Sequence, residues 1–278
     1  TNLSSAPGFL AFAAWFAGFE WLRGHIFTGF PWNLFGYAWA DFLPIVQTVA
    51  VTDIYFLTWL TIIWAALPGF LLVSDIRKEK ISLSVFAAAI FILCTGFGFW
   101  RLHQPQPQNV PGVMIHLVQP NISQSEKWSR EKIAEHFRTL LKLSQPDTDN
   151  PEEKVIIVWP ETAISQGITQ DKEAMQAIAY MLNSYKGQAW LLTGLLRYEA
   201  DKKRYYNSLA MIDNKGIISN IYDKHHLVPF GEFIPLQSWF SFLSPIVASL
   251  AAFAPGDAMV LLPVGSHLVS TAICYEVV

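Results

Sequence analysis

Two apolar runs of about twenty residues, each without a charged side chain, dominate the N-terminal third of the chain. Residues 54–74 contain no charge over 21 positions, and residues 81–100 contain none over 20. A helix needs about 20 apolar residues to cross a bilayer, so both runs are predicted to span a membrane; buried core helices are the alternative. A third run, residues 7–22, is short and contains Glu20, and we interpret it as the second half of a span.

Basic residues between the two long runs predict an orientation. Arg77, Lys78 and Lys80 lie in this short connection, and short cytoplasmic loops are enriched in Lys and Arg. The loop at 75–80 is therefore predicted to face the cytoplasm, and the chain after Arg101 to lie on the outer side, in a bacterial periplasm. We interpret Asp53, which precedes the longest run, as lying at the depth of the lipid headgroups, and the mid-span Cys94 as a packing residue.

Composition excludes several classes of protein. Charged residues make up 15% of the 278 residues, against about 25% in soluble domains, which disfavours a wholly water-soluble chain. A net charge of −3 gives no basic surface for nucleic acid. Cys94 and Cys274 are far apart in unlike contexts, so we expect no disulfide. The sequence has no Cys/His spacing typical of a metal site.

A polar, proline-rich linker separates two differently patterned regions. We expect a transmembrane region at 1–102, a linker at 103–111 and a second domain at 112–278. In that domain, short apolar strands alternate with amphipathic helices, which favours a layered α/β fold. The expected strands are residues 113–118, 155–159, 189–194, 206–212, 216–222 and 267–274, and the expected helices are residues 129–144 and 171–185.

Three polar groups stand beside apolar strands and could carry covalent acyl chemistry. Cys274 ends the last expected strand, and it is interpreted either as a nucleophile or as a buried structural cysteine. Glu161 follows Pro160, which ends a strand, so its carboxylate is either catalytic or an exposed turn residue. Lys224 follows the hairpin, and its ammonium could stabilise an oxyanion or be solvated. Glu232 is a second acid within reach of the same loop.

These residues carry a resemblance. Glu161 in Trp-Pro-Glu-Thr, Lys224 in Tyr-Asp-Lys-His-His-Leu-Val-Pro-Phe-Gly-Glu and Cys274 in Ala-Ile-Cys-Tyr-Glu are similar to the Glu–Lys–Cys triad of the nitrilase (carbon–nitrogen hydrolase) superfamily. Their separations, 63 and then 50 residues, agree with that order. Segments 22–37, 119–128 and 226–235 resemble, more narrowly, the bacterial apolipoprotein N-acyltransferases. The resemblance implies a nitrilase-like αββα sandwich, truncated at its C-terminal side, attached to membrane helices.

The resemblance also implies a mechanism and a role for each site residue. Such an enzyme forms a thioester on the cysteine with an acyl chain from a phospholipid, and then passes the acyl group to an amine, in a ping-pong reaction. The implied catalytic residues are Glu161 as general base, Lys224 for the oxyanion and Cys274 as nucleophile. Residues implied to orient the triad or line the site are Glu232, Glu276, Tyr275 and Trp128. The thiol itself carries the acyl group, so no metal or organic cofactor is implied.

The implied partners are two lipids. The donor is a phospholipid, expected to be phosphatidylethanolamine, and the acceptor is the N-terminal amino group of a diacylglyceryl-cysteine apolipoprotein. The implied location is the bacterial inner membrane, with the catalytic domain in the periplasm. Two alternatives stay open: a membrane-anchored amidase that uses water as acceptor, and a non-catalytic lipid- or lipoprotein-binding module. The apolar segment 239–255 is either a mobile arm over the acyl chains or an ordinary core segment.

Overall fold

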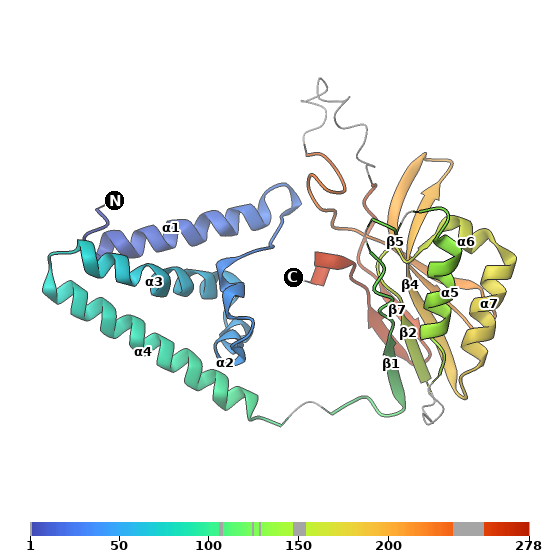
Figure 1. The fold of residues 1–278 in the computed structure, drawn as a ribbon, viewed down its shortest axis with the longest axis horizontal. Coiled ribbons are helices and arrows are strands. Elements are labelled where there is room, and N and C mark those ends of the chain that lie inside the picture. The colour runs from blue at the N-terminus through green and yellow to red at the C-terminus, as the bar shows by residue number, and fades with distance from the viewer. Residues whose placement is uncertain are drawn as a thin grey trace, which may run out of the picture. The chain divides into compact units, whose positions relative to one another are not determined.

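A computed structural model describes residues 2–105, 108–123, 125–127, 129–146, 154–235 and 253–277. The chain divides into two compact units, Thr1–Gln108 and Asn109–Val278. The first unit is helical and the second contains the sheets (Figure 1).

The described residues of the first unit form three long helices and one short helix. They are α1 (Ala6–His25), α2 (Leu43–Val46), α3 (Ile54–Val73) and α4 (Arg77–Leu102), with 3₁₀ turns at Ile26–Thr28, Phe35–Trp39 and Gln47–Ala50. Helix α1 begins where the Ser5 side chain accepts a hydrogen bond from the Gly8 N–H. Helix α3 begins where Asp53 accepts from the Phe56 N–H at 2.7 Å. Such caps satisfy N–H groups that have no partner inside the helix, so Asp53 has a structural role at this position.

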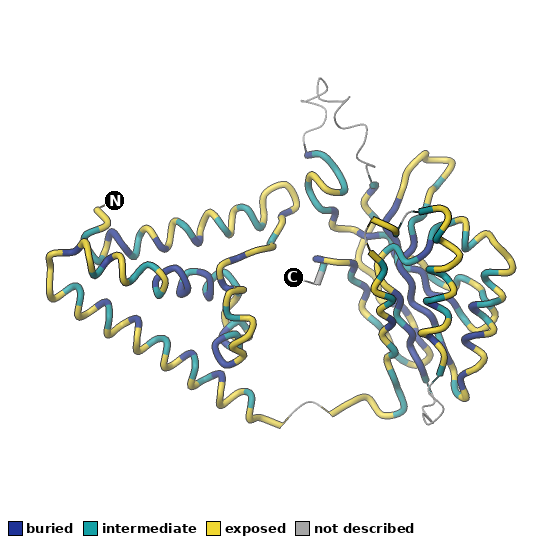
Figure 2. The backbone as a smooth tube through the Cα atoms, viewed as in Figure 1, coloured by how far each residue is buried: buried dark blue, intermediate teal, exposed yellow. Residues whose placement is uncertain are grey.

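Helices α3 and α4 are long and apolar enough to cross a membrane, and among the described residues no other helix is. Helix α1 has 20 residues, as many as α3, so it falls short of a third full span in apolarity and not in length. Much of the surface of α4 is exposed (Figure 2), including the apolar residues Val85, Ile92 and Leu93. An exposed apolar surface of this kind suits contact with lipid. Cys94, in contrast, is buried among apolar side chains, which confirms its interpretation as a packing residue.

The second unit is built on a mixed six-stranded sheet. Its strands are β1 (Val113–Leu117), β2 (Lys154–Val158), β3 (Ile164–Ser165), β4 (Gln188–Glu199), β5 (Arg204–Ile212) and β6 (Ile218–Asp223), in the order β1-β2-β4-β5-β6 with β3 paired to β4. The pairs β1–β2 and β2–β4 are parallel, and β4–β5 and β5–β6 are antiparallel. Between β5 and β6, Asp213 accepts hydrogen bonds from the Lys215 and Ile217 N–H groups. Such a side-chain turn favours the predicted hairpin, which is confirmed.

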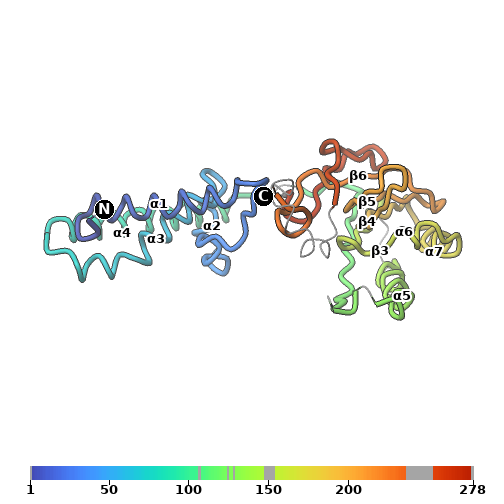
Figure 3. The backbone as a smooth tube through the Cα atoms, turned by 90° about the horizontal axis from the view of Figure 1, so that it is seen from above, coloured from blue at the N-terminus to red at the C-terminus, as the bar shows by residue number. Residues whose placement is uncertain are grey.

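Alternating side chains give this sheet two apolar faces. Helices α5 (Ile133–Leu143), α6 (Gln166–Gln170) and α7 (Lys172–Asn183) lie on one face (Figures 1 and 3), where Ile157 and Leu191 are fully buried. A second, two-stranded sheet of β7 (Leu261–Val264) and β8 (His267–Ser270) packs on the other face, against Ile156 and Leu192. The predicted layered α/β architecture is therefore confirmed for the second unit.

Two strands of the second unit differ from the prediction, and one predicted segment falls mostly outside the described residues. The last strand ends at Ser270, so the prediction of a strand through Cys274 is wrong at its end; Cys274–Val277 form a 3₁₀ turn instead. Strand β7 was not predicted, because Pro263 interrupts its apolar run and proline is uncommon inside strands. Most of the proposed arm at 239–255 lies outside the described residues, which resume at Phe253.

Candidate active site

Glu161 stands in a tight turn after β2. The strand ends at Val158, and Pro160 follows Trp159, so the carboxylate lies at the carboxyl end of a parallel strand, as the sequence predicts. Thr162 has a φ of +48°, a left-handed conformation that costs energy for a residue with a Cβ. Gly194 of β4 lies directly under this turn: a Cβ there would come within 2.3 Å of the Thr162 nitrogen. The position of Glu161 therefore depends on a glycine in the neighbouring strand.

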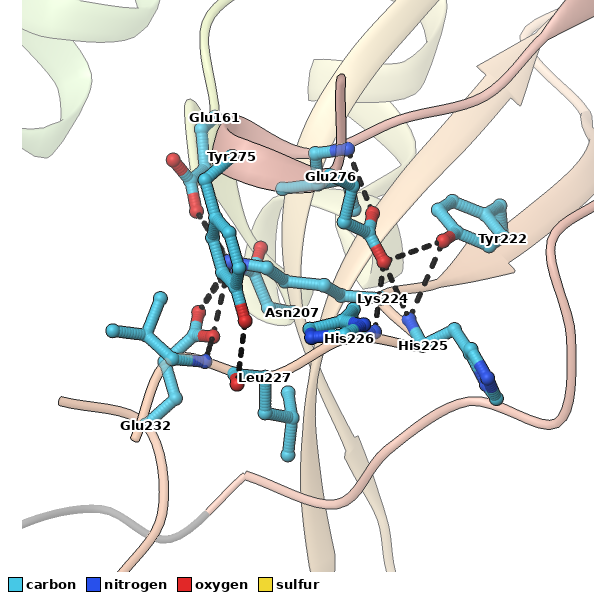
Figure 4. Close-up of polar contacts among 12 residues, drawn as sticks. Glu161, Asn207, Tyr222, Lys224, His225, His226, Leu227, Glu232, Tyr275 and Glu276 are labelled. Atoms are coloured by element: carbon cyan, nitrogen blue, oxygen red, sulfur yellow. Dashed lines mark hydrogen bonds and ion pairs between the residues drawn. The ribbon is translucent and has the colours of Figure 1, made fainter. Parts of the chain in front are cut away.

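Lys224 follows β6 and is 1% exposed. Its ammonium lies 3.0 Å from the Glu232 carboxylate and 4.0 Å from the Glu161 carboxylate (Figure 4). A buried ammonium is tolerated only when carboxylates and hydrogen bonds compensate for the lost water. The alternative of a solvated lysine after a hairpin is therefore wrong, and the structure brings Lys224, Glu161 and Glu232 together.

Asn207 joins the two carboxylates, and it is a site residue that the sequence analysis missed. Its Nδ2 donates to Glu161 Oε1 at 2.6 Å and to Glu232 Oε1 at 3.0 Å. Two carboxylates can only accept hydrogen bonds, so this contact also fixes which end of the amide faces them. Its backbone carbonyl accepts from the Lys224 N–H at 2.8 Å. The one available signal was a polar residue in a strand that is otherwise apolar and buried.

Cys274 opens the turn after β8, and it is exposed. Exposure excludes the reading of a buried structural cysteine. Its φ is +58°, and a non-glycine residue held in this region is often found at a functional site. The next residue connects this turn to Lys224: the Tyr275 ring centroid lies 5.2 Å from the Lys224 ammonium, and the Tyr275 hydroxyl donates to the Leu227 carbonyl at 2.6 Å.

Glu276 ties the cysteine turn to the lysine loop. One carboxylate oxygen accepts from the Tyr222 hydroxyl at 2.8 Å and from the N–H groups of His225 and His226, both at 2.9 Å. The other oxygen accepts from the Ile273 N–H at 2.8 Å (Figure 4). Burial, together with the hydrogen bond to Glu276, raises the pKa of Tyr222 to about 12. Glu276 therefore receives four hydrogen bonds that fix both segments of the site.

The two histidine side chains that follow Lys224 make different contacts. His225 Nδ1 lies 2.7 Å from the Gly256 carbonyl oxygen, and the His226 ring meets the Tyr275 ring edge-on at 5.5 Å.

Trp128, predicted to line the site, lies outside the described residues. Its neighbour Lys127 donates to the Glu161 carbonyl oxygen at 3.0 Å, and burial lowers the pKa of the Lys127 amine. Lys127 therefore connects the 119–127 loop to the Glu161 turn.

This arrangement has the components of covalent acyl chemistry. An exposed thiol lies on the same short turn as Tyr275, whose ring contacts a buried ammonium, and that ammonium is paired with two carboxylates. A carboxylate can accept a proton from a thiol or an amine. An ammonium with little access to water can stabilise a developing oxyanion. Among the described residues, no cluster of His, Cys, Asp and Glu has the arrangement of a metal site.

Comparison with known proteins identifies the family. Residues 115–278 match the carbon-nitrogen hydrolase family model, and residues 2–67 match the model of the apolipoprotein N-acyltransferase N-terminal domain. An apolipoprotein N-acyltransferase of Bradyrhizobium diazoefficiens is 34% identical over 287 residues, which cover 99% of this chain and 53% of the relative. Proteins of the same name from Rhizobium meliloti and Brucella melitensis are 36% and 37% identical, covering 96% and 97% of this chain.

The chain spans about half the length of these relatives. Solved structures overlay only distantly: an amidase from Nesterenkonia sp. is 15% identical with a TM-score of 0.34, covering 59% of this chain and 54% of the amidase. The family assignment therefore depends on the sequence match, which includes Glu161, Lys224 and Cys274 within its range. The chain belongs to the carbon–nitrogen hydrolase family, and it carries ahead of that domain a segment that matches the N-terminal domain of apolipoprotein N-acyltransferases.

Proposed function

We propose that the protein containing this chain transfers a fatty acyl chain from a phospholipid to the N-terminal amino group of a diacylglyceryl-cysteine apolipoprotein. The observation that carries the proposal is the burial of Lys224 between the carboxylates of Glu232 and Glu161, beside the turn that holds Cys274. The relatives, which are named apolipoprotein N-acyltransferases, and the matching N-terminal segment support the choice of substrates.

In the first half-reaction, Cys274 is the nucleophile. Glu161 accepts the thiol proton, and the thiolate attacks the ester carbonyl of the phospholipid. The negative charge that develops on the carbonyl oxygen is stabilised by Lys224 and by backbone N–H groups. The carbon–oxygen bond then breaks, and the leaving alkoxide takes the proton from Glu161. The products are a thioester on Cys274 and a lysophospholipid.

In the second half-reaction, the amine of the apolipoprotein attacks the thioester. Glu161 accepts a proton from this amine, and Lys224 again stabilises the oxyanion. The carbon–sulfur bond breaks, an amide forms, and the proton returns from Glu161 to the Cys274 sulfur. One site thus serves both lipids in turn, in a ping-pong order that needs no metal or cofactor.

The other predicted residues act by positioning. Glu232 fixes the Lys224 ammonium, and its second oxygen accepts from the Val228 N–H at 2.9 Å. Glu276 and Tyr275 connect the cysteine turn to the lysine loop. Trp128 is proposed to line the site because the family resemblance implies that role.

The proposed location is the bacterial inner membrane, with more than one span and with the second unit in the periplasm. Helices α3 and α4 have the length and apolarity for two spans. Arg77, Lys78 and Lys80 begin α4, and such basic residues favour the cytoplasmic side. Phosphatidylethanolamine is the proposed acyl donor.

The test distinguishes acyl transfer from hydrolysis. The whole protein is incubated with phosphatidylethanolamine, with and without a synthetic diacylglyceryl-cysteine peptide, and both N-acylated peptide and free fatty acid are measured. We expect N-acylated peptide and little free fatty acid. Free fatty acid that appears equally fast without the peptide would instead indicate an amidase-type enzyme with water as acceptor. If neither N-acylated peptide nor free fatty acid forms, the result would favour the non-catalytic lipid-binding module.

A further inference from the structure

A cavity of about 280 Å³ lies within the second unit, next to Glu161. It opens at the carboxyl ends of β1 and β2. It lies between segment 119–122, segment 160–165, which includes β3, and the helices α5 and α6. Folded interiors are close-packed and contain few voids larger than a water molecule. A cavity of this size beside the reacting groups is therefore better explained as a place for a ligand than as a packing defect.

The walls of the cavity are mainly apolar. They are formed by side chains from two loops and two helices: Ile122, Ile133, Phe137, Leu140, Ile164 and Ile168. The ionisable groups at its lining are Glu161, Lys127 and His136. The Lys127 ammonium is turned toward the Glu161 carbonyl oxygen, to which it donates at 3.0 Å. The cavity thus combines an apolar interior with one end at the catalytic carboxylate residue.

Backbone strain marks both loops at the mouth of the cavity. Asn121 has a φ of +52° and Thr162 a φ of +48°, and both residues line the cavity. Left-handed conformations of residues other than glycine cost energy and are concentrated where a structure holds a ligand or a reacting group. The strained conformation of Thr162 is explained by the Glu161 turn. The strained conformation of Asn121 is not explained by any contact of the candidate active site.

We propose that this cavity binds part of the fatty acyl chain during transfer, and so helps to select chain length. This inference rests on the acyl-transfer function proposed above. Apolar walls favour an alkyl chain over a headgroup or a peptide. Taking about 30 Å³ for a group the size of a water molecule, the cavity holds roughly nine methylene-sized groups. Glu161 lines the cavity and also contacts Asn207 in the polar cluster, so a chain bound there lies beside the reacting groups.

The first test fills the cavity and measures chain-length preference. Ile133→Trp and Ile168→Phe each enlarge a side chain of the cavity wall, on α5 and α6 respectively. Leu143→Trp is the matched control, because Leu143 lies on α5, is exposed and does not line the cavity. The rate of acyl-enzyme formation is measured in the whole protein with phosphatidylethanolamines that carry C8 or C16 chains.

We expect the filling variants to lower the ratio of the C16 rate to the C8 rate. Each methylene that loses its contacts costs about fourfold in binding, so the loss of two gives roughly a 15-fold change. The rate with C8 chains and the Leu143→Trp ratio should stay near those of the wild type. If both filling variants keep the wild-type ratio, the cavity does not hold the acyl chain.

The second test does not depend on catalysis, so it separates this inference from the proposed function. Palmitic acid with a photoreactive diazirine at its terminal carbon is bound to the Cys274→Ala protein and irradiated. We expect cross-links to peptides that contain Ile133, Phe137 or Ile168, competed by unlabelled palmitate and reduced in Ile133→Trp. Cross-links confined to other parts of the chain would overturn the inference even if acyl transfer is established. Cross-links in the cavity without any acyl transfer would instead contradict the proposed function alone.

Discussion

The Lys224 ammonium lies 3.0 Å from both carboxylate oxygens of Glu232, and the Lys224 residue is 1% exposed. The ammonium is therefore almost free of water, and the second carboxylate in range, that of Glu161, is 4.0 Å away. Charge interactions strengthen when water is excluded, so this ammonium can act strongly on any oxyanion formed beside it. It also means that the fold depends on Glu232 as much as the chemistry does.

Removing Glu232 should therefore affect stability and activity together. Glu232→Ala leaves a buried ammonium with a distant partner, and breaking a buried ion pair typically costs about 3–5 kcal/mol. We expect a clear fall in the Tm of the whole protein and loss of acyl-enzyme formation. Glu232→Gln, which keeps a hydrogen-bond acceptor, should lose less stability. Glu131→Ala, at an exposed position, is the control; an unchanged Tm in Glu232→Ala would contradict this account of the ion pair.

Asn207 should control the pH dependence of the reaction. Asn207→Asp replaces the donor shared by Glu161 and Glu232 with a third carboxylate, and a nearby like charge raises the pKa of a carboxyl group. In the proposed mechanism Glu161 must be ionised to accept a proton, so the acidic limb of the rate profile should move to higher pH, by about one unit or more. The test measures the rate of acyl-enzyme formation from about pH 5 to about pH 9. If the acidic limb lies at the same pH in Asn207→Asp and in the exposed control Asn214→Asp, Asn207 does not control the pH dependence.

Gly194→Ala should displace the Glu161 carboxylate while the sheet remains folded. The added Cβ would lie 2.3 Å from the Thr162 nitrogen and 2.6 Å from the Glu161 Cα, so the Glu161 turn has to move. Misplacement by about 1 Å can lower a rate on the order of 100-fold. Gly167→Ala is the matched control, since its Cβ would make only an ordinary contact at 3.7 Å. Circular dichroism checks the fold, and a wild-type rate in Gly194→Ala would show that the turn tolerates the shift.

Tyr222 should limit stability at alkaline pH. Its pKa is raised from 10.0 to about 12 in the folded protein, chiefly by burial. A raised pKa means that the folded state holds a proton the unfolded state releases, so this stability is complete below pH 10 and is lost as pH rises through about 12. Tyr222→Phe should show a smaller fall of Tm between these pH values. Tyr180→Phe, at a position 79% exposed, should fall as the wild type does; equal falls in all three proteins would contradict the prediction.

The sequence predicted the framework of the second unit because its elements have clear periods. The strand before Glu161 is an apolar run closed by Pro160, and the β5–β6 hairpin has the turn residue Asp213. Local pattern is sufficient for such elements, since the period of apolar residues and the turn chemistry act over a few positions.

The details that form the site could not be predicted in this way. The burial of Lys224 depends on Glu232 and Glu161, which approach it only in the folded chain. Asn207 is one polar residue in an apolar strand, and its function depends on two carboxylates from other segments. The left-handed backbone conformation of Cys274 is imposed by tertiary contacts of the neighbouring residues, against the local preference for an extended conformation.

The most direct measurement is the intact mass of the whole protein after incubation with phosphatidylethanolamine and no acceptor. The account predicts a gain of one acyl chain, removed by hydroxylamine at neutral pH as expected for a thioester, and absent in Cys274→Ala. Cys94→Ala, which changes the other free cysteine, should still gain the chain. An unchanged mass in the wild type, or an equal gain in Cys274→Ala, would contradict the claim that Cys274 carries the acyl group.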